Sequence, residues 1–226
     1  MQPLVVAMDG PSGSGKSSVS RAVATELDLR YLDTGAMYRA MTWWMLREGV
    51  DVNDRQAVAA AADKPSLCSG TDPADPGITV DGVDVSGSIR SREVTGAVSA
   101  VSAVPAVRAR LVAMQQAIIA RCCADDGGIV VEGRDIGTVV APDADVKVYL
   151  TADPEARASR RTLEQSGADV AATQADLLRR DKIDSGRTTA PLAMADDAVH
   201  VDTTPYTLEQ VVEQVVALVE RATASS

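Results

Sequence analysis

The chain has 226 residues, of which 46% are hydrophobic, and this length suits one folding unit with an insertion or two. Its formal net charge of −10 argues against a broad surface for nucleic acid or anionic lipid, because either surface needs an excess of cations on one face. No apolar run reaches about 18 residues, and the start of the chain is too short and uncharged for a secretory signal. We therefore expect a cytoplasmic protein without a nucleic-acid or membrane partner.

The basic residues are strongly biased toward arginine. Only four of the 22 are lysine, and the guanidinium group of arginine binds phosphate in a bidentate way. By composition alone, a general preference for surface arginine explains this bias equally well. The three cysteines, Cys68, Cys122 and Cys123, lack the spacing of a zinc site and are odd in number for a disulfide framework, so we expect reduced thiols.

The N-terminal part of the chain alternates between apolar strands and helices. Residues 3–8 form a continuous apolar run, and the segment after the following glycine-rich loop has helical spacing of its apolar residues. Residues 30–32 are a second strand candidate. The pattern then predicts a helix over 35–49 with Trp43 and Trp44 in the core.

Residues 66–92 have a different texture, with short polar and β-branched pieces punctuated by glycine and proline. Two alternating runs flank Asp81-Gly82, a pair that is typical of a hairpin turn. We interpret this region as a small β-rich insertion. A helical pattern follows over 92–124 and is interrupted at Pro105.

The C-terminal part returns to alternating strands and helices. Three further buried-strand candidates are residues 129–131, 145–150 and 198–202, and three helices are predicted over 154–165, 170–182 and 207–222. Five short strands with helices between them favour an α/β fold, a five-stranded parallel sheet with helices on both faces. Together with the glycine-rich loop over residues 10–17, this arrangement is typical of the P-loop NTPase type. Ligands of such sheets gather at the carboxyl ends of the strands.

The first strand runs into a phosphate-binding motif. Gly10, Gly15, Lys16 and Ser17 fit the pattern G-x-x-x-x-G-K-[ST], and they lie between a strand and a helix as the motif requires. Backbone amides of such a loop surround the β-phosphate, and the following helix adds its positive end. We expect Lys16 to bridge the β- and γ-phosphates of ATP and Ser17 to be a ligand of Mg²⁺. The alternative is a glycine-rich helix entry with a solvated lysine.

Glu132 follows the apolar strand 129–131, where a carboxylate near the metal's water shell belongs. Aspartate is more usual there, and the longer glutamate favours a water-mediated contact. An ion pair with Arg134 is an equally good interpretation. His200 lies on the apolar strand 198–202 and is expected to pack rather than to act as a base.

The motifs favour a small kinase over other nucleotide-binding proteins. The N-K-x-D run of a guanine-binding switch is absent from the sequence, and the acidic balance opposes a helicase. Phosphoryl transfer depends mainly on positioning and charge neutralisation, so an acceptor that is itself a phosphate needs cations around it. The sequence therefore predicts arginines at the strand ends.

Six motifs, in this order, resemble those of bacterial cytidylate kinases. They are GPSGSGKS, LDTGAMYR, VSGSIR, VPAVR, EGRDIGTVV and RDKIDSGRTTAPL, and they extend over most of the chain. The resemblance implies transfer of the γ-phosphate of ATP to CMP or dCMP, with CDP or dCDP and ADP as products. It also implies a core (1–36, 93–152 and 182–226), an acceptor-binding arm (37–92) and a lid (153–181).

The resemblance assigns roles to named side chains. The donor nucleotide would lie on the loop Gly10, Pro11, Ser12, Gly13, Ser14, Gly15, Lys16, Ser17 and Ser18. The acceptor phosphate would be held by Arg39, Arg134 and Arg187, and Thr34 would lie beside the nucleotide. The cytosine would be read by Ser99, Arg108 and Asp135, and the sugar hydroxyls by Asp184 with Arg180. Lys16, Arg134, Arg157 and Arg187 would stabilise the transferred group.

Each assignment has a simpler alternative. Arg39 fits a solvated helix face, Arg108 fits an ion pair with Glu93, and Asp184 fits a turn cap before Gly186. The segment RDKIDSGR has Lys182 and Ile183 between its acidic positions, where the resemblance implies more charge, so the strength of sugar selection stays open.

Three arginines recur at helical spacing in the lid region. Arg157, Arg160 and Arg161 can share one helix face, where like charges repel unless an anion joins them. We expect Arg157 and Arg161 to close over the ATP phosphates and exclude water, with Gly167 as a hinge.

Two other functions stay open at this point. The acceptor could be UMP, AMP or a non-nucleotide such as shikimate, or the protein could be a slow nucleotide-binding switch supported by the donor loop alone. No motif requires a second copy to complete the site, so we expect a monomer.

Overall fold

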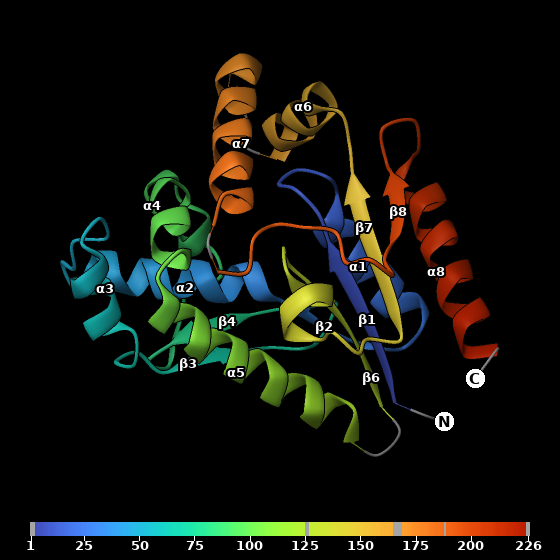
Figure 1. Ribbon diagram of the computed structural model, residues 1–226, viewed down its shortest axis with the longest axis horizontal. Coiled ribbons are helices and arrows are strands. Elements are labelled where there is room, and N and C mark those ends of the chain that lie inside the picture. Colours follow the sequence, from blue (N-terminus) through green and yellow to red (C-terminus); the bar gives the residue numbers. More distant parts are fainter. Residues whose placement is uncertain (1–2, 125–126, 165–168, 188, 225–226) are drawn as a thin grey trace.

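A computed structural model of the chain describes residues 3–124, 127–164, 169–187 and 189–224 (Figure 1). Its central sheet has five parallel strands in the order β2-β6-β1-β7-β8. The strands are β1 (Leu4–Asp9), β2 (Arg30–Asp33), β6 (Gly128–Glu132), β7 (Val146–Thr151) and β8 (Val199–Asp202). The parallel α/β sheet expected from the sequence is confirmed.

Alternate residues of the central strands face two separate hydrophobic clusters. On one face, Val6 and Met8 pack with α1 (Lys16–Glu26) and α8 (Leu208–Ala224). On the other face, Ala7 packs with α2 (Thr34–Arg47) and α5 (Pro105–Cys122). Both faces are covered, which explains why the strands read as continuous apolar runs rather than as alternating ones.

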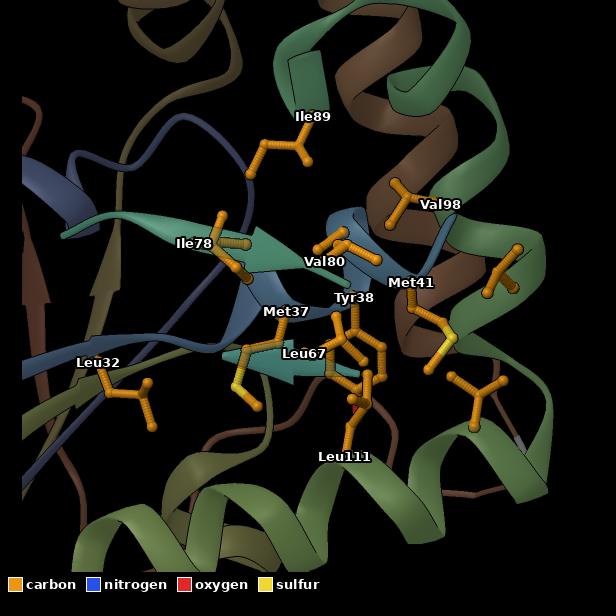
Figure 2. Packing of buried hydrophobic residues seen from close by; sticks show 14 of the residues in the cluster. Leu32, Met37, Tyr38, Met41, Leu67, Ile78, Val80, Ile89, Val98 and Leu111 are labelled. Atoms are coloured by element: carbon orange, nitrogen blue, oxygen red, sulfur yellow. The ribbon is translucent and has the colours of Figure 1, made fainter. Parts of the chain in front are cut away.

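The expected insertion is a three-stranded antiparallel sheet that packs on α2. Its strands are β3 (Leu67–Ser69), β4 (Ile78–Val80) and β5 (Val83–Asp84), and the Asp81-Gly82 turn joins the last two. Figure 2 shows Ile78 and Val80 directed toward Met37 and Met41 of α2. The helix α3 (Arg55–Ala61) precedes this sheet and was not predicted, although its alanine run is a helix-forming sequence.

The insertion is also tied to the core sheet and to α1. The Arg21 side chain donates from Nε to Pro73 O at 2.9 Å and from Nη2 to Ala74 O at 3.3 Å. The backbone amide of Tyr31 on the edge strand β2 donates to Thr71 O at 2.9 Å. These bonds cover an edge that would otherwise expose unpaired backbone groups.

The helical region before β6 is broken as predicted. A short 3₁₀ helix, η1 (Ser88–Arg90), leads into α4 (Arg92–Ser102). Pro105, the first residue of α5, separates α4 from α5. No single helix in the described part of the chain is long and apolar enough to span a membrane; α4 and α5 pass such a test only together, and they meet at 98°.

Two features depart from the sequence-based expectations. Trp43 and Trp44 are only half buried, because Met41 and Met45 take the inward face of α2. His200 is exposed on the edge strand β8, where its Nε2 lies 2.7 Å from Thr151 Oγ1. The expectation that His200 packs in the core is therefore wrong, since an edge strand leaves one side open.

The lid region consists of α6 (Pro154–Glu164) and α7 (Val170–Ser185), which pack against each other above the sheet (Figure 1). The expected lid boundary at residue 181 falls inside α7, so α7 carries residues assigned to both lid and core. The hinge expected at Gly167 lies outside the described residues.

Candidate active site

A cavity of about 610 Å³ opens at the carboxyl ends of the core strands. The loop after β1, the start of α2 after β2, and residues 132–135 at the end of β6 all line it. The small sheet, α4 and α5 close one side, and α6 and α7 contribute from above. Parallel strands bring these distant segments together because all their carboxyl ends meet at one edge.

The charge of this cavity is opposite to that of the whole chain. Ten lysine or arginine side chains but only four aspartate or glutamate side chains line it among the described residues, whereas the chain carries a net charge of −10. The arginine bias therefore has a local meaning. The cavity concentrates positive charge for a ligand with several negative charges.

The donor loop has the backbone conformation that its glycines predict. Gly10 has φ +143°, and a Cβ there would lie 2.0 Å from Leu150 O, so only glycine fits. Gly15, at φ +91°, precedes α1, whose N-terminus has no side-chain cap. The first amides of this 11-residue helix therefore face the cavity without an intramolecular acceptor, which is the arrangement that binds phosphate.

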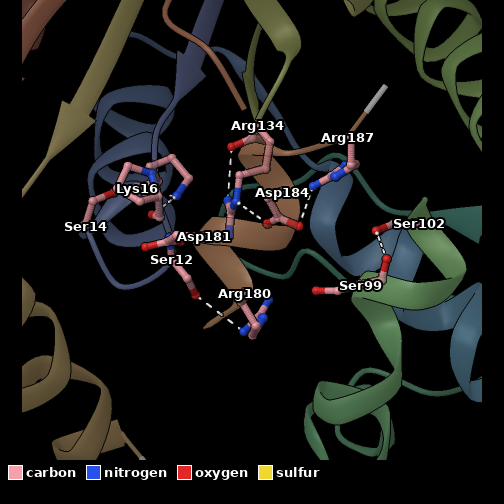
Figure 3. Close-up of polar contacts among 12 residues, drawn as sticks. Ser12, Ser14, Lys16, Ser99, Ser102, Arg134, Arg180, Asp181, Asp184 and Arg187 are labelled. Atoms are coloured by element: carbon pink, nitrogen blue, oxygen red, sulfur yellow. Dashed lines mark hydrogen bonds and ion pairs between the residues drawn. The ribbon is translucent and has the colours of Figure 1, made fainter. Parts of the chain in front are cut away.

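The side chain of Lys16 is folded back over its own loop. Its Nζ donates to Pro11 O at 2.7 Å and lies 3.5 Å from Ser14 Oγ (Figure 3). Burial lowers the pKa of Lys16, and the Arg134 guanidinium lowers it further. Phosphate oxygens in the cavity would have the opposite effect, because a nearby anion favours the charged ammonium.

Glu132 is linked to two hydroxyl groups. Ser17 Oγ donates to its Oε2 at 3.1 Å, and the Tyr31 hydroxyl donates to its Oε1. Burial raises the pKa of Glu132, since water cannot solvate the carboxylate. No ion pair joins Glu132 to Arg134 within the ranges that the structure describes, so that alternative is wrong.

Asp184 joins two of the expected phosphate-binding arginines. Its Oδ1 lies 2.5 Å from Arg187 Nη2, and its Oδ2 lies 3.4 Å from Arg134 Nε (Figure 3). All three side chains line the cavity, and that of Asp184 is only 7% exposed. The structure thus gives Asp184 a role as a bridge between arginines rather than as a simple turn cap.

Arg39 and Arg180 both line this cavity. Arg39 Nη1 donates to Ile89 O at 3.1 Å and to Thr95 Oγ1 at 2.9 Å, so it is not a solvated helix residue. Arg180 Nη1 lies 3.5 Å from Ser12 Oγ of the donor loop. Burial lowers the pKa of both guanidinium groups, and neighbouring arginines add to the effect. Such crowding of cations is stabilised when an anion enters.

A buried ion pair lies at the far end of the cavity. Arg108 on α5 pairs with Asp135, and their side chains are 4% and 7% exposed. The Arg108 guanidinium carbon also lies 5.4 Å from the centroid of the Tyr38 ring. Burial raises the pKa of Asp135, and Arg108 opposes that rise. The pairing with Glu93 that the sequence allowed is not the one observed.

The three arginines of α6 do not act as one face. Arg157 is 5% exposed, pairs with Asp181 on α7, and donates from Nη1 to Ser12 O at 3.0 Å. Arg160 donates to Thr203 Oγ1 and Thr203 O, each at 2.8 Å. Arg160 and Arg161 line the cavity, whereas Arg157 lies behind the donor loop. In this conformation Arg157 therefore contacts the loop backbone, and the expected closure over the phosphates needs a movement of α6.

The structure brings most of the expected residues into this one cavity. All nine expected acceptor residues line it: Thr34, Arg39, Ser99, Arg108, Arg134, Asp135, Arg180, Asp184 and Arg187. Three of the expected donor-site residues do not line it: Gly10, Pro11 and Arg157.

Asp9 is a buried residue that the sequence analysis missed. It is 5% exposed, and its carboxylate accepts from Ile136 N at 2.9 Å and from Gly137 N at 2.8 Å. These amides begin a π-helical turn, η3 (Ile136–Val140), which follows Asp135 directly. Burial raises the pKa of Asp9 to about 6, although both amide bonds oppose the rise. The sequence signal that could have identified Asp9 is its position at the end of an apolar strand, directly before Gly10 of the donor loop.

The residues present fit a magnesium ion that is carried mainly by phosphate and water. Within the described ranges, no cluster of three or more His, Cys, Asp or Glu side chains could hold a metal by itself. Ser17 Oγ lines the cavity and donates its proton to a buried carboxylate, which leaves lone pairs free for a cation. Mg²⁺ typically uses one or two protein ligands together with substrate phosphates.

Known proteins match this chain over nearly its whole length. The family described as cytidylate kinase matches residues 6–221. A cytidylate kinase of Streptomyces griseus is 64% identical, over 96% of this chain and 93% of that protein. A cytidylate kinase of Corynebacterium glutamicum is 49% identical, over 99% of this chain and 97% of that protein.

Solved structures agree on the fold. A gluconokinase from Sinorhizobium meliloti superposes with a TM-score of 0.51 at 18% identity, over 100% of this chain and 98% of that one. An uncharacterized protein from Eubacterium ventriosum gives a TM-score of 0.53 at 9% identity, over 96% and 98% of the two chains. At these identities the likeness concerns the fold alone.

Proposed function

The chain belongs to the cytidylate kinase family and is an ATP-dependent kinase that phosphorylates CMP and dCMP, and from this premise we propose how its residues divide the work. The observation that carries the proposal is one cationic cavity, into which both the donor loop and the arginines at the strand ends open. Two phosphorylated substrates need such a cavity, because their charges must be neutralised before the phosphates can approach.

The donor triphosphate lies on the loop from Gly10 to Ser18 and on the uncapped start of α1. Lys16 leaves Pro11 O and binds the β- and γ-phosphates, whose negative charge favours its ammonium form. Ser17 would hold Mg²⁺, which would supply charge neutralisation on these phosphates. Glu132 accepts the hydrogen bond from the Ser17 hydroxyl and does not bind the metal directly.

The acceptor phosphate is held by Arg39, Arg134 and Arg187. Before the acceptor binds, Asp184 keeps Arg134 and Arg187 in place by its two ion pairs. An incoming dianion takes over these guanidinium groups, because it offers more acceptor oxygens than one carboxylate. Asp184 is then free to accept hydrogen bonds from the sugar hydroxyls, and Arg180 assists by donating to their oxygens.

The acceptor base lies between Ser99, Arg108 and Asp135. The Asp135 carboxylate accepts from the exocyclic amine of cytosine, and Arg108 donates to the ring carbonyl and nitrogen. Uracil presents a carbonyl where cytosine has its amine, so the base would offer no hydrogen-bond donor to Asp135. Thr34, which donates to Glu132 O at 2.7 Å, lies beside the nucleotide.

The lid helices α6 and α7 close over the donor. Arg161 lines the cavity and approaches the phosphates, and Arg157 joins it when α6 moves relative to the donor loop. Closure excludes water, which would otherwise accept the phosphoryl group. We keep the division into core, acceptor arm and lid as part of this proposal. The enzyme acts as a cytoplasmic monomer in pyrimidine nucleotide metabolism.

The direct test is release of ADP from ATP and Mg²⁺ with CMP, dCMP, UMP, AMP or no acceptor in parallel. We expect turnover led by CMP and dCMP and little ADP without an acceptor. Equal ADP release in every reaction would mean that water is the acceptor. Preference for UMP over CMP would remove the role given to Asp135. Light scattering after size-exclusion chromatography tests the monomer.

A further inference from the structure

The carboxylate of Glu132 is fixed at both of its oxygens. Ser17 Oγ donates to Oε2 at 3.1 Å, and the Tyr31 hydroxyl donates to Oε1. Both acidic and phenolic side chains are almost fully buried, with Glu132 3% and Tyr31 1% exposed. Each carboxylate oxygen therefore has one protein donor: the exposed Ser17 hydroxyl on the cavity side and the buried Tyr31 hydroxyl on the other.

Without the Tyr31 hydroxyl, the Lys16 ammonium could compete for this carboxylate. Lys16 and Glu132 both line the cavity, yet no ion pair between the two occurs in the described part of the chain. Lys16 instead donates to Pro11 O. By holding Oε1, Tyr31 keeps the other oxygen directed at Ser17 and leaves Lys16 available for phosphate.

The position of the Tyr31 hydroxyl is itself rigid. Its ring belongs to the hydrophobic cluster between the sheet and α1, and its backbone is paired with Val130 of β6. Its amide donates to Thr71 O at 2.9 Å on the other side. A buried phenol held in this way acts as a fixed donor, because neither the ring nor the strand can shift without disturbing the core.

We propose that Tyr31 is a positioning residue for the magnesium site: its hydroxyl fixes Glu132, which in turn directs the Ser17 lone pairs toward Mg²⁺ bound to the donor nucleotide. The proposal rests on the role given above to Ser17. Outer groups that orient a metal ligand typically change metal affinity by about 10- to 100-fold when they are removed.

The test is the affinity of the protein for ATP, measured by calorimetry with Mg²⁺ and again with a chelator in its place. Tyr31→Phe removes one hydroxyl and leaves the ring in its packing. We expect ATP affinity with Mg²⁺ to fall by about 10-fold and affinity with the chelator to change less than about twofold. The Mg²⁺ concentration needed for half-maximal ATP binding should rise in parallel.

Two further variants make the result specific. Tyr149→Phe removes the same atom from a half-buried tyrosine on β7 that contacts His200, and it should change neither affinity. Glu132→Gln should itself weaken ATP binding only with Mg²⁺, and Tyr31→Phe should then add little in that background, because both act through one carboxylate. If Tyr31→Phe folds poorly, Glu132→Gln alone still tests whether this carboxylate supports ATP binding with Mg²⁺.

Equal weakening with and without Mg²⁺ would overturn the proposal, since Tyr31 would then support only the shape of the loop. No change in either condition would overturn it as well. Ser17→Ala separates this inference from the proposed function: if that variant binds ATP with Mg²⁺ as the wild type does, the role of Ser17 has failed first.

Discussion

Replacing Asp9 by asparagine should change how the stability of this protein depends on pH. The carboxylate is 5% exposed, and burial raises its pKa from 3.8 to about 6. A carboxyl group whose pKa is raised on folding stabilises the folded state below its unfolded pKa, and this contribution is lost as pH rises through the folded pKa. The wild type therefore loses stability between pH 4 and pH 7 through Asp9, whereas Asp9→Asn does not titrate at this position.

The size of the effect follows from the two pKa values. Their difference corresponds to about 3 kcal/mol over the full titration, and to about 2 kcal/mol between pH 4.5 and pH 7.5. The variant also loses one acceptor, because Ile136 N and Gly137 N donate to different carboxylate oxygens and the asparagine NH₂ group that replaces one of them cannot accept. That loss costs about 1 to 3 kcal/mol relative to the ionised carboxylate. The pH-dependent part of the difference in free energy of unfolding can be separated from this cost, because the other titrating groups are common to both proteins.

The assay is urea unfolding at several pH values from 4.5 to 7.5, followed by the fluorescence of Trp43 and Trp44. The free energy of unfolding of Asp9→Asn minus that of the wild type should increase by about 2 kcal/mol over this range. Asp197→Asn is the control: a hydrogen bond from Lys147 lowers the pKa of that exposed carboxyl, so removing it cannot make the difference rise with pH. A constant difference for Asp9→Asn would refute the reasoning, because Asp9 would then titrate alike in both states.

Three further outcomes are expected from the geometry. Lys16→Met should lower kcat at least about 100-fold with an unchanged circular dichroism spectrum, and a loss below about tenfold would contradict its phosphate role. Asp135→Asn should lower kcat/KM for CMP by about 10- to 100-fold and leave UMP turnover unchanged, whereas equal losses for both acceptors would remove its base-reading role. Arg21→Gln, which loses the bonds to Pro73 O and Ala74 O, should speed amide exchange in residues 71–77, and unaltered exchange would show that Arg21 does not anchor the insertion.

Much of the fold was predictable because its signals are local. The run of buried strand residues, the glycines of the donor loop and the apolar face of α1 follow one another within a short segment. The Asp81-Gly82 turn and the proline that starts α5 are equally local. These elements form where propensity, periodicity and turn chemistry agree. The half-buried tryptophans and the exposed histidine were misplaced because periodicity says which residues are apolar, not which neighbours cover them.

The candidate site was predictable as a collection of residues but not as a set of contacts. The resemblance to cytidylate kinases named Arg39, Arg134 and Arg187 together, and all three line one cavity at the carboxyl ends of the parallel strands. The sequence did not reveal that Asp184 joins two of these arginines, or that Arg157 turns behind the donor loop to Asp181. Those pairings depend on how α6 and α7 pack on each other and on the sheet.

The sequence by itself determined the donor loop, the alternation of strands and helices, and the chemistry gathered at the strand ends. Only the tertiary structure decided which buried groups meet: Tyr31 with Glu132, 101 positions later, and Asp9 with Ile136 and Gly137, 127 and 128 positions later. The physical reason is register. A strand's neighbours are set by the order and pairing of the whole sheet, and shifting one strand by a residue would turn Tyr31 to the opposite face.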